Sequence, residues 1–434
     1  MFIKKIEIYN FKSIEKQIIN FSPLTMLVGA NASGKSNLIN VFRFIQNIIT
    51  DGIENAVALQ GGIQYVTNAN LQKGEKIEIS FIIDVRNETW IRHLSDKKYA
   101  LEVEEVECKF VIQPNKKGMG YAIPYDYIKM SYDCYSYDAT AVKEEKYKPL
   151  NLSCSTTFER KSRTSSVKVK HKVYSASGLA SEEENNKKLI DAFNDDRAAE
   201  FFASITNQEK NELMLFRLSL LLPPSFYENT FIRIFDFDPK ELKKSSSMAS
   251  TRMLEENGSN LASVLQTILR NKEQKNKLST LLKEYLPFVE NVSIENNPDK
   301  SFSYKIRECY NSKAFYANFL SDGTVSILAL IISLYFEDES KIVILEEPER
   351  NIHPKLLSNL LASAEDVSLD RQVIITTHNP EFLRHANIEN VRLVSRNDCG
   401  KTRVTSPMES STVLAFLKND LGLDDLFLQD MLED

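Results

Sequence analysis

Three short runs of consecutive apolar residues predict strands buried in the centre of a sheet. They lie within residues 24–28, 341–347 and 371–378. Polar residues follow each run at once: a glycine-rich turn, a pair of glutamates and a histidine. In parallel α/β sheets, ligands bind beyond the carboxyl ends of the strands. The pattern therefore predicts an α/β protein whose site forms where these three strands end.

A different pattern, in which apolar and polar residues alternate, predicts half-buried strands elsewhere in the chain. The clearest example is residues 77–85, where every second position is Ile, Phe or Val. Further strands are expected at 3–9, 17–21, 101–112, 127–135, 167–173, 391–394 and 402–405. Helical spacing predicts helices at 37–53, 184–222, 260–269, 277–285 and 411–421, and the serine-rich segment 243–250 is expected to be a mobile loop.

The turn after the first buried run has the form GxxxxGK[ST], from Gly29 to Ser36, between a predicted strand and a predicted helix. Such a turn wraps its N–H groups around phosphates, with the positive end of the helix directed at them. We expect Lys35 to be exposed and to contact the β and γ phosphates, and Ser36 to ligate Mg²⁺. The residues expected to hold ATP are Gly29, Asn31, Ser33, Gly34, Lys35, Ser36 and Asn37.

The two glutamates after the second run complement this turn. Glu346 is placed to hold Mg²⁺ through its water shell, and Glu347 to orient or deprotonate an attacking water. Two acids after an apolar run are often only a solvated strand end. Their combination with a phosphate-binding turn in one chain favours the chemical interpretation.

Two weaker features fit the same site. Ser321 and Gly323 precede an apolar helix and predict an anion-binding helix terminus, although plain N-capping is the alternative. His378 follows the third buried run, where a histidine can sense the γ-phosphate by hydrogen bonding. A purely structural histidine is the alternative.

Length, charge and cysteine content indicate the number of lobes, the kind of partner and the cellular compartment to expect. The chain has 434 residues, which predicts two or three lobes, and its net charge of −6 gives no general support for nucleic-acid binding. Residues 159–172 are locally basic and could follow phosphates, with a solvated hairpin face as the alternative. Five scattered cysteines predict free thiols in a reducing compartment. With no signal peptide or long apolar segment, a cytoplasmic protein is expected.

Together these motifs resemble the nucleotide-binding head of ABC-type ATPases of the SMC/RecF-like group. Within it, the chain is similar to AAA-type ATPases of bacterial phage-defence loci, relatives of the overcoming-lysogenization-defect proteins. The likeness covers residues 1–90 and 255–434. The motifs that carry it are Ile8–Ser13, Asn257–Leu261, Leu320–Thr324, Glu346–Glu349, Ile352–Pro354 and His378.

The resemblance implies a dimer in which two heads sandwich ATP. Ser321 and Gly323 of one subunit would contact the γ-phosphate bound by Lys35 of the other, and residues 349–354 would cross the interface. Lys12 matches a basic position that helps hold nucleotide in related heads. Gln60 and Gln64 are the candidates for the glutamine loop. The chain departs from the pattern at Glu346, where aspartate is usual, and at Arg350-Asn351, where an Asn-Gly type turn is common.

The expected fold is a P-loop NTPase of ABC-head type, with a mixed sheet, an antiparallel β-subdomain and a large helical insertion. The predicted division is 1–95 (first lobe), 96–255 (insertion) and 256–434 (second lobe). The β-rich start of the insertion would extend the antiparallel sheet, and residues 184–300 would form a separate helical lobe.

The segment after the head leaves no room for the Toprim nuclease of longer relatives. We therefore expect a slowly hydrolysing, dimeric ATPase switch of an anti-phage system that acts through a separate effector. A DNA-repair ATPase and a non-hydrolysing, ATP-dependent scaffold are the alternatives.

Overall fold

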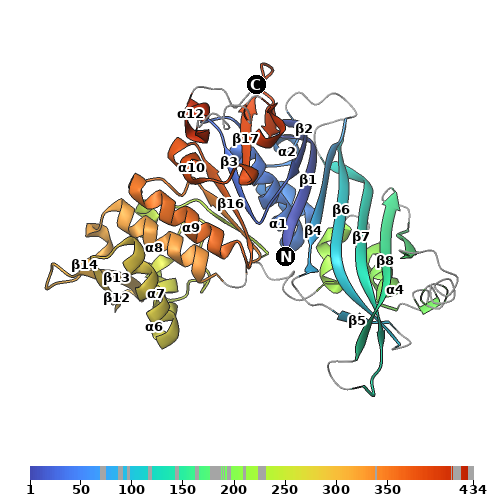
Figure 1. The fold of residues 1–434 in the computed structure, drawn as a ribbon, viewed down its shortest axis with the longest axis horizontal. Helices are drawn as coiled ribbons and strands as arrows, with labels where there is room; N and C mark the ends of the chain where they lie inside the picture. The colour runs from blue at the N-terminus through green and yellow to red at the C-terminus, as the bar shows by residue number, and fades with distance from the viewer. Residues whose placement is uncertain are drawn as a thin grey trace. The chain divides into compact units, whose positions relative to one another are not determined.

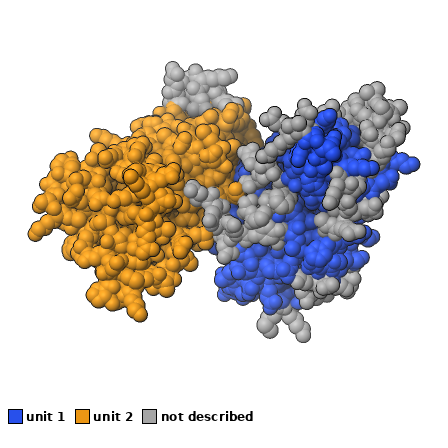
Figure 2. Space-filling view, turned by 90° about the horizontal axis from the view of Figure 1, so that it is seen from below, with its two compact units in different colours: residues 1–21, 36–231, 396–403 blue, residues 22–35, 232–395, 404–434 orange. Residues whose placement is uncertain are grey.

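The computed structural model divides into two compact units that interleave along the chain (Figure 2). Unit 1 comprises residues 1–21, 36–231 and 396–403, and unit 2 comprises residues 22–35, 232–395 and 404–434. The predicted division into three consecutive segments differs from this one and stays a prediction. The structure describes residues 1–68, 75–86, 91–94, 98–115, 120–141, 146–161, 166–175, 187, 189, 191–192, 197–208, 212–222, 231–337, 340–411, 413 and 422–428.

Unit 1 is built on an eight-stranded antiparallel sheet (Figure 1). Its order is β2-β1-β4-β6-β7-β8-β9, with β5 paired to β6. The predicted extension of the first-lobe sheet by the insertion is confirmed, because β6 pairs directly with β4. The strands are β1 (Phe2–Phe11), β2 (Ile14–Asn20), β4 (Ile77–Asp84), β5 (Ile91–His93), β6 (Tyr99–Pro114), β7 (Tyr121–Tyr137), β8 (Tyr147–Lys161) and β9 (Lys168–Ser175).

The helices of unit 1 include α1, which begins in the phosphate-loop motif. It runs over Lys35–Leu59 with a kink at Gly52, whose φ of 81° is non-helical. Gly52 thus lies next to the end of the predicted helix at residue 53. The other described helical segments are α2 (Ile63–Val66), α4 (Arg197–Gln208) and the 3₁₀ helix η2 (Met214–Leu220).

Unit 2 contains a six-stranded sheet in the order β10-β15-β16-β3-β17-β18. Neighbouring strands from β10 to β17 are parallel. Strand β10 was not predicted from the sequence, although Ile232, Ile234 and Phe235 give it three apolar positions out of four. The strands are β3 (Leu24–Val28), β10 (Ile232–Phe235), β15 (Ile342–Glu346), β16 (Gln372–Thr377), β17 (Val391–Arg396) and β18 (Thr402–Thr405).

A smaller antiparallel sheet and most of the helices complete unit 2. The sheet holds β11 (Ser246–Ser247), β12 (Val289–Asn296), β13 (Ser301–Glu308) and β14 (Phe315–Tyr316). The α-helices are α5 (Pro239–Leu242), α6 (Leu261–Arg270), α7 (Lys272–Tyr285), α8 (Asp322–Tyr335), α9 (Leu357–Val367), α10 (Pro380–His385) and α12 (Leu423–Leu428). The 3₁₀ helices are η4 (Ala317–Phe319), η5 (Pro354–Leu356), η6 (Ile388–Asn390) and η7 (Pro407–Glu409).

Two expectations for this region are wrong. Residues 184–300 do not form one separate lobe: the chain passes from unit 1 to unit 2 at residues 231–232, and the apolar faces of α6 and α7 join the same core as β3, β15 and β16. The segment 243–250 is not a plain loop, because Ser246 and Ser247 pair with β13 and Ser246 is buried. The strand could not be predicted from its side chains, because serines give no apolar pattern and the pairing is made by the backbone.

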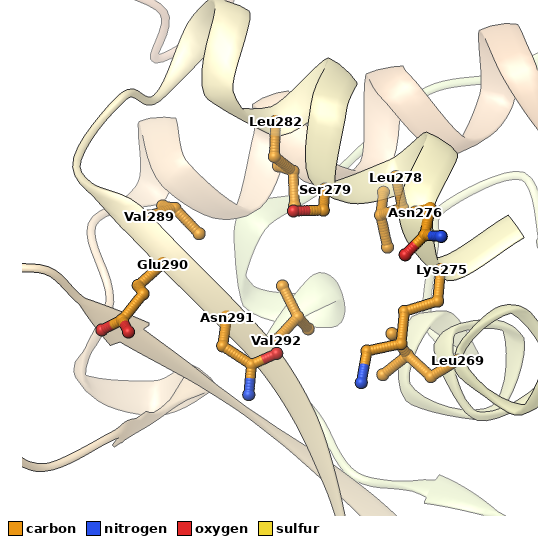
Figure 3. A pocket seen from close by; sticks show the side chains of 10 residues that line it. All are labelled: Leu269, Lys275, Asn276, Leu278, Ser279, Leu282, Val289, Glu290, Asn291 and Val292. Carbon is orange, nitrogen blue, oxygen red and sulfur yellow. The ribbon is translucent and has the colours of Figure 1, made fainter. Parts of the chain in front are cut away.

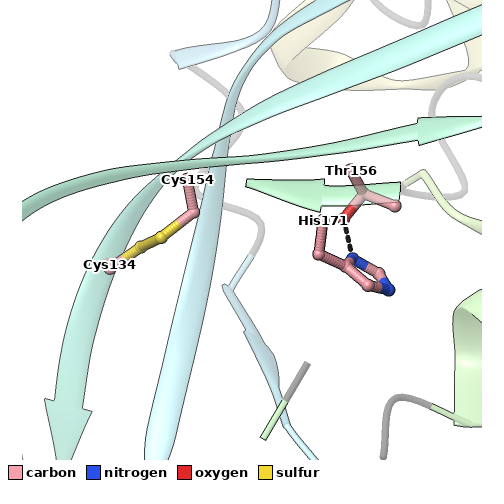
Figure 4. The surroundings of a disulfide bond; sticks show 4 residues. All are labelled: Cys134, Cys154, Thr156 and His171. Carbon is pink, nitrogen blue, oxygen red and sulfur yellow. Dashed lines mark hydrogen bonds between the residues drawn. A yellow bond between two sulfur atoms is a disulfide. The ribbon is translucent and has the colours of Figure 1, made fainter. Parts of the chain in front are cut away.

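The cysteines also differ from expectation. Cys134 on β7 and Cys154 on β8 form a disulfide, while Cys108, Cys309 and Cys399 are free (Figure 4). The pairing of β7 with β8 places the two cysteines next to each other across neighbouring strands, a proximity that linear spacing does not reveal.

Parts of the predicted sequence features lie outside the described residues: most of the helix 411–421, residues 162–165 of the basic segment, and residues 184–186, 188, 190, 193–196 and 209–211 of the helical stretch 184–222. Among the described helices, none is long and apolar enough to cross a membrane.

Candidate nucleotide-binding site

Three adjacent parallel strands of unit 2 end at the same edge of the sheet. Glu346 on β15 pairs with Thr376 on β16, and Thr377 pairs with Val28 on β3. The hydrogen bonds continue past the strands, since the Glu347 amide donates to the Thr376 carbonyl at 3.0 Å and the Gly29 amide donates to the Thr377 carbonyl at 3.2 Å. The phosphate loop, the two glutamates and His378 therefore meet at one edge, as the three apolar runs predict.

Backbone geometry explains the glycines of the loop. A Cβ on Gly29 would lie 2.0 Å from the Val394 carbonyl oxygen, closer than any real contact. Gly34 has φ of 113°, a conformation in which an L side chain is strained. Ala32 also has a positive φ, 63°, whereas Ser33 between them does not, so positive and negative φ values alternate along the loop. Such alternation turns successive N–H groups toward a common concavity suited to an anion.

The exposed position predicted for Lys35 is wrong. Its side chain is buried, at 6% exposure, because the amino group turns back onto the loop. Nζ donates to the carbonyls of Gly29 at 2.6 Å and Ala30 at 2.9 Å. Burial lowers the pKa of Lys35, and the negative charges of Glu347 and Glu349 act in the opposite direction. A phosphate oxygen would replace neutral acceptors with a charged one.

The rest of the loop is suited to an anionic ligand. Ser33 is buried, and its Oγ has no hydrogen-bond partner within the described part of the chain. Asn31 and Ser36 are exposed. Asn37 is engaged within unit 1, where its amide donates to Ser13 Oγ at 2.6 Å. A buried hydroxyl without a partner is unusual in proteins and fits a site built for a further group.

Glu347 is contacted at both carboxylate oxygens. Arg350 Nε donates to Oε2 at 2.9 Å, and His378 Nδ1 lies 3.2 Å from Oε1. Burial would raise the pKa of Glu347, but the hydrogen bond and charge of Arg350 outweigh it, with His378 acting in the same direction, and lower the pKa. The carboxylate is therefore held in its ionised form. His378 itself is partly exposed, so it can reach a ligand at this edge.

Glu349 is a third carboxyl close to this edge, expected from the sequence only as part of the Glu346–Glu349 motif and of the 349–354 turn at the dimer interface. It is buried, Thr377 Oγ1 donates to its Oε1 at 2.5 Å, and its Oε2 lacks a partner among the residues described here. Burial raises the pKa of Glu349. A glutamate two positions after a predicted catalytic one was the available signal, since carboxyls close to a reacting group are candidates for a functional role.

Arg350 and Asp236 are two further residues that the sequence analysis did not connect with the site. Arg350 was expected from the sequence only as a departure from the family pattern and as part of the 349–354 turn at the dimer interface. Its Nη1 donates to Asp236 Oδ1 at 2.7 Å while its Nε holds Glu347. Asp236 follows β10, the strand that was missed, so its position next to β15 could not be foreseen.

The motif Leu320–Thr324 at the start of helix α8 has a local structural explanation for its serine and its glycine. Ser321 is the N-cap of α8, and its Oγ accepts from the Thr324 amide at 3.1 Å. A Cβ on Gly323 would lie 2.7 Å from the Asn351 carbonyl oxygen, so the turn after the glutamates packs against this glycine. The N-capping alternative is thus confirmed for Ser321. Contact with a second subunit's nucleotide stays a prediction.

The remaining predicted ligands belong to unit 1. Lys12 lies in the turn between β1 and β2 with φ of 47°, and burial together with the charge of Arg43 lowers its pKa. Gln60 lies just after α1, and Gln64 on α2 is exposed. The geometry of unit 1 by itself does not choose between the two glutamines, and all three roles stay predictions.

The basic segment 159–172 separates into two environments. Arg160 points into the protein: it is 2% exposed and donates to Asp126 at 2.9 Å and to the Thr206 carbonyl at 3.2 Å. Arg160 is therefore excluded from any phosphate contact. Lys168, Lys170 and Lys172 are exposed at alternate positions of β9, which pairs with β8 as the predicted hairpin.

A cavity of about 100 Å³ lies elsewhere in unit 2, between α7 and β12 (Figure 3). Lys275, Asn276 and Ser279 line it from the helix and Asn291 from the strand, with leucines and valines between them. It contains none of the predicted site residues.

Within the described ranges, no group of three or more His, Cys, Asp or Glu side chains forms a metal-binding cluster. A magnesium ion at the nucleotide site would therefore need oxygens from the nucleotide and from water as well as from the protein.

Comparison with known proteins agrees with this geometry. The chain is 46% identical over 63 residues to the chromosome partition protein Smc of Halothermothrix orenii, a match covering 14% of this chain and 5% of that protein. Among solved structures, an Smc head bound to the C-terminal winged-helix domain of ScpA aligns over 93% of this chain and 98% of its own length, with a TM-score of 0.51 and 15% identity. This likeness confirms the predicted ABC-head-type α/β fold. The model of the AAA ATPase domain family matches residues 1–383, and the chain therefore belongs to that family.

Proposed function

We propose that this chain is an ATP-driven switch that binds ATP with Mg²⁺, hydrolyses it slowly and pairs with a second head. The observation that carries the proposal is the convergence of the phosphate loop, Glu346-Glu347 and His378 at the ends of adjacent parallel strands. Family membership supports an ATPase in general. The expected setting is the cytoplasm.

Residues of the chain divide the chemistry between them. The loop amides and Lys35 bind the phosphates, with Ser33 Oγ as a further donor inside the loop. Ser36 and Glu346 would hold Mg²⁺, which supplies positive charge against the phosphate oxygens. Glu347 accepts a proton from the attacking water, and His378, next to its Oε1, orients the carboxylate and senses the phosphate. The Glu346 carboxylate reaches one methylene further than the usual aspartate, which suits contact through water.

The wider role follows from the sequence resemblance. Ser321 and Gly323 of one head would complete the site of the other, so that ATP binding drives dimerisation and hydrolysis reverses it. A separate effector protein of a bacterial anti-phage system would respond to the change of state. A ligand acts as such a switch only through its different affinity for two states, and about 3 kcal/mol shifts the effector population more than a hundredfold.

Glu347→Gln tests the proposal directly. The amide keeps the shape of the side chain but cannot accept the proton, so ATP should bind and persist. We expect phosphate release to fall at least about a hundredfold and the protein to elute as an ATP-dependent dimer. Turnover at the wild-type rate would remove Glu347 from the catalytic role. Glu381→Gln, which changes a partly exposed carboxylate of the same unit on α10, is a control that should leave turnover unchanged.

A second candidate function is a DNA-clamping repair ATPase. The exposed row of Lys168, Lys170 and Lys172 favours it, since lysines at alternate strand positions present their charges on one face. Lysines on an edge strand also prevent strand pairing between molecules, which needs no ligand. Phosphate release with and without duplex DNA separates the two: stimulation that a triple Lys→Gln variant removes favours the clamp.

A further inference from the structure

Arg350 joins two carboxylates at the ends of neighbouring strands. Its Nε donates to Glu347 Oε2 at 2.9 Å, and its Nη1 donates to Asp236 Oδ1 at 2.7 Å. Different nitrogens make the two bonds, so both hold at the same time. Because a guanidinium is planar and rigid, fixing one edge on Asp236 also fixes the direction of the Nε–H that meets Glu347.

The backbone brings these groups together by a tight turn. Glu347 has φ of 43°, and the Arg350 amide donates back to the Glu347 carbonyl at 3.1 Å. On the other side, β10 pairs in parallel with β15, with Phe235 opposite Leu345, so Asp236 and Glu346 both directly follow this pair. Arg350 therefore lies between two strand ends that the sheet holds in register.

The environment favours orientation over simple surface attraction. Glu347 is 16% exposed, whereas Arg350 and Asp236 are 46% and 44% exposed. Phe235, Phe237 and Pro348 line a small apolar pocket together with Glu347 and Arg350. An exposed ion pair stabilises a fold by about 1 kcal/mol at most, so removing these contacts should cost the fold little.

We infer that Arg350, anchored by Asp236, is a positioning residue that fixes the Glu347 carboxylate for water activation. Arg350 holds Oε2, which leaves Oε1, the oxygen beside His378, as the one directed at the reacting water. Without Arg350 the carboxylate can rotate, and a misplaced base loses most of its effect. This inference rests on the proposed function, because it assigns Arg350 to the reaction in which Glu347 acts.

The test measures steady-state phosphate release, ATP affinity and thermal stability in one series of variants. Arg350→Ala should lower kcat about tenfold with KM and ATP affinity changed less than about twofold. Asp236→Asn should lower kcat by a smaller factor, about threefold, since Arg350 then keeps only one partner. Arg350→Lys should recover part of the loss, because an ammonium supplies charge without the fork that spans both carboxylates.

Two references make the outcome decisive. Arg384→Ala removes another arginine of unit 2 that bridges two carboxylates, Glu381 and Asp424, and should leave kcat unchanged. In the Glu347→Gln background, Arg350→Ala should add no further loss, since a positioning residue acts only through the group it positions. The inference is wrong if Arg350→Ala leaves kcat intact while Glu347→Gln abolishes turnover. It is also wrong if, in both Arg350→Ala and Asp236→Asn, the loss of kcat is accompanied by a matching rise in KM and loss of stability. Wild-type turnover in Glu347→Gln would instead overturn the proposed function, and this inference with it.

Discussion

The two sheets of this molecule use polar residues in opposite ways. Strands of the antiparallel sheet in unit 1 alternate, so their polar side chains are spread along whole faces. The central strands β3, β15 and β16 of the sheet in unit 2 are largely apolar and buried, so their polar side chains gather where the strands end. Helix α8 and its neighbours pack on one face of these strands, and residues of the opposite face, such as Leu27, Ile344 and Ile374, are buried as well, which leaves the strand ends as the available place for chemistry. Sheet type thus decides where a site can form.

The buried charges show the same contrast. In unit 1, Arg160 and Asp126 are paired at 2.9 Å, and each has further partners: Arg160 bonds the Thr206 carbonyl, and Asp126 accepts from the Met214 amide at 2.7 Å. In unit 2, Glu349 Oε2 and Ser33 Oγ are buried without partners in the described residues. Saturated networks specify structure, whereas an unsatisfied buried group next to a phosphate loop is available to a ligand.

The largest effect is expected from breaking the saturated network. Asp126→Ala leaves the Arg160 guanidinium buried without its counter-charge, which costs about 3–5 kcal/mol. Urea unfolding should show this loss in the unfolding free energy. Asp133→Ala, a partly exposed aspartate on the same strand, is the control and should change stability by less than about 1 kcal/mol. A similar small change in Asp126→Ala would mean that Arg160 finds another partner.

In unit 2, by contrast, removing a buried charge should damage binding more than folding. Lys35→Ala deletes the cation of the phosphate loop, and ATP affinity should fall about a hundredfold because a charge-assisted contact is lost. Isothermal titration measures the affinity, and a thermal melt in the absence of nucleotide measures the fold. Since the hydrogen bonds of the Lys35 amino group, at 2.6 and 2.9 Å, go to carbonyls of the loop itself and tie it to no other element, the melting temperature should change little. Equal affinity in variant and wild type would show that the loop does not bind phosphate.

The sequence predicted the parts of the site that are local. Consecutive apolar residues indicated β3, β15 and β16, and the motif after β3 indicated the loop, because both signals need only a few neighbouring residues. What it missed depends on distant pairing. The partnership of Arg350 with Asp236 requires β10 beside β15, and the burial of Lys35 requires the loop to turn its carbonyls inward. The Cys134–Cys154 pairing requires β7 beside β8.

Acid titration should further separate the two regions. Burial would raise the pKa of Asp84 in unit 1, but Arg86 and Lys4 outweigh it and lower the pKa to about 2, whereas burial raises the pKa of Glu349 in unit 2. A carboxyl with a depressed pKa stabilises the fold above its unfolded pKa, and this contribution disappears as pH falls from about 4 to about 2.

Asp84→Asn should therefore lower the unfolding free energy by about 2 kcal/mol at neutral pH and remove that part of the acid dependence. Urea unfolding at several pH values between 7 and 2 checks it. The wild-type and variant curves should converge at the acid end, because both side chains are then neutral. Parallel curves over the whole range would show that the ion pairs of Asp84 contribute nothing through titration.

The smallest expected effect tests whether the strand-end site is completed by a second molecule. Ser321→Arg should spare ATP binding, because Ser321 caps its own helix α8 and lies outside the phosphate loop, yet block turnover by placing a bulky cation at the other head's phosphates.

Lys35→Ala protein is expected to be inactive for a different reason, because it cannot bind the phosphates itself. In a mixed dimer, one site combines the intact Lys35 of one chain with the intact Ser321 of the other. With random pairing in equal amounts, about a quarter of the wild-type sites are restored, because half of the dimers are mixed and each carries one good site. Phosphate release from the mixture, compared with each variant alone, measures this recovery.

Ser321→Thr is the control, because threonine keeps the cap without the added charge and should retain turnover. No recovery on mixing, with both variants folded and dimerising, would mean either that the heads do not share their sites or that turnover needs both sites intact, and a covalently linked heterodimer with a single defective subunit distinguishes these two outcomes.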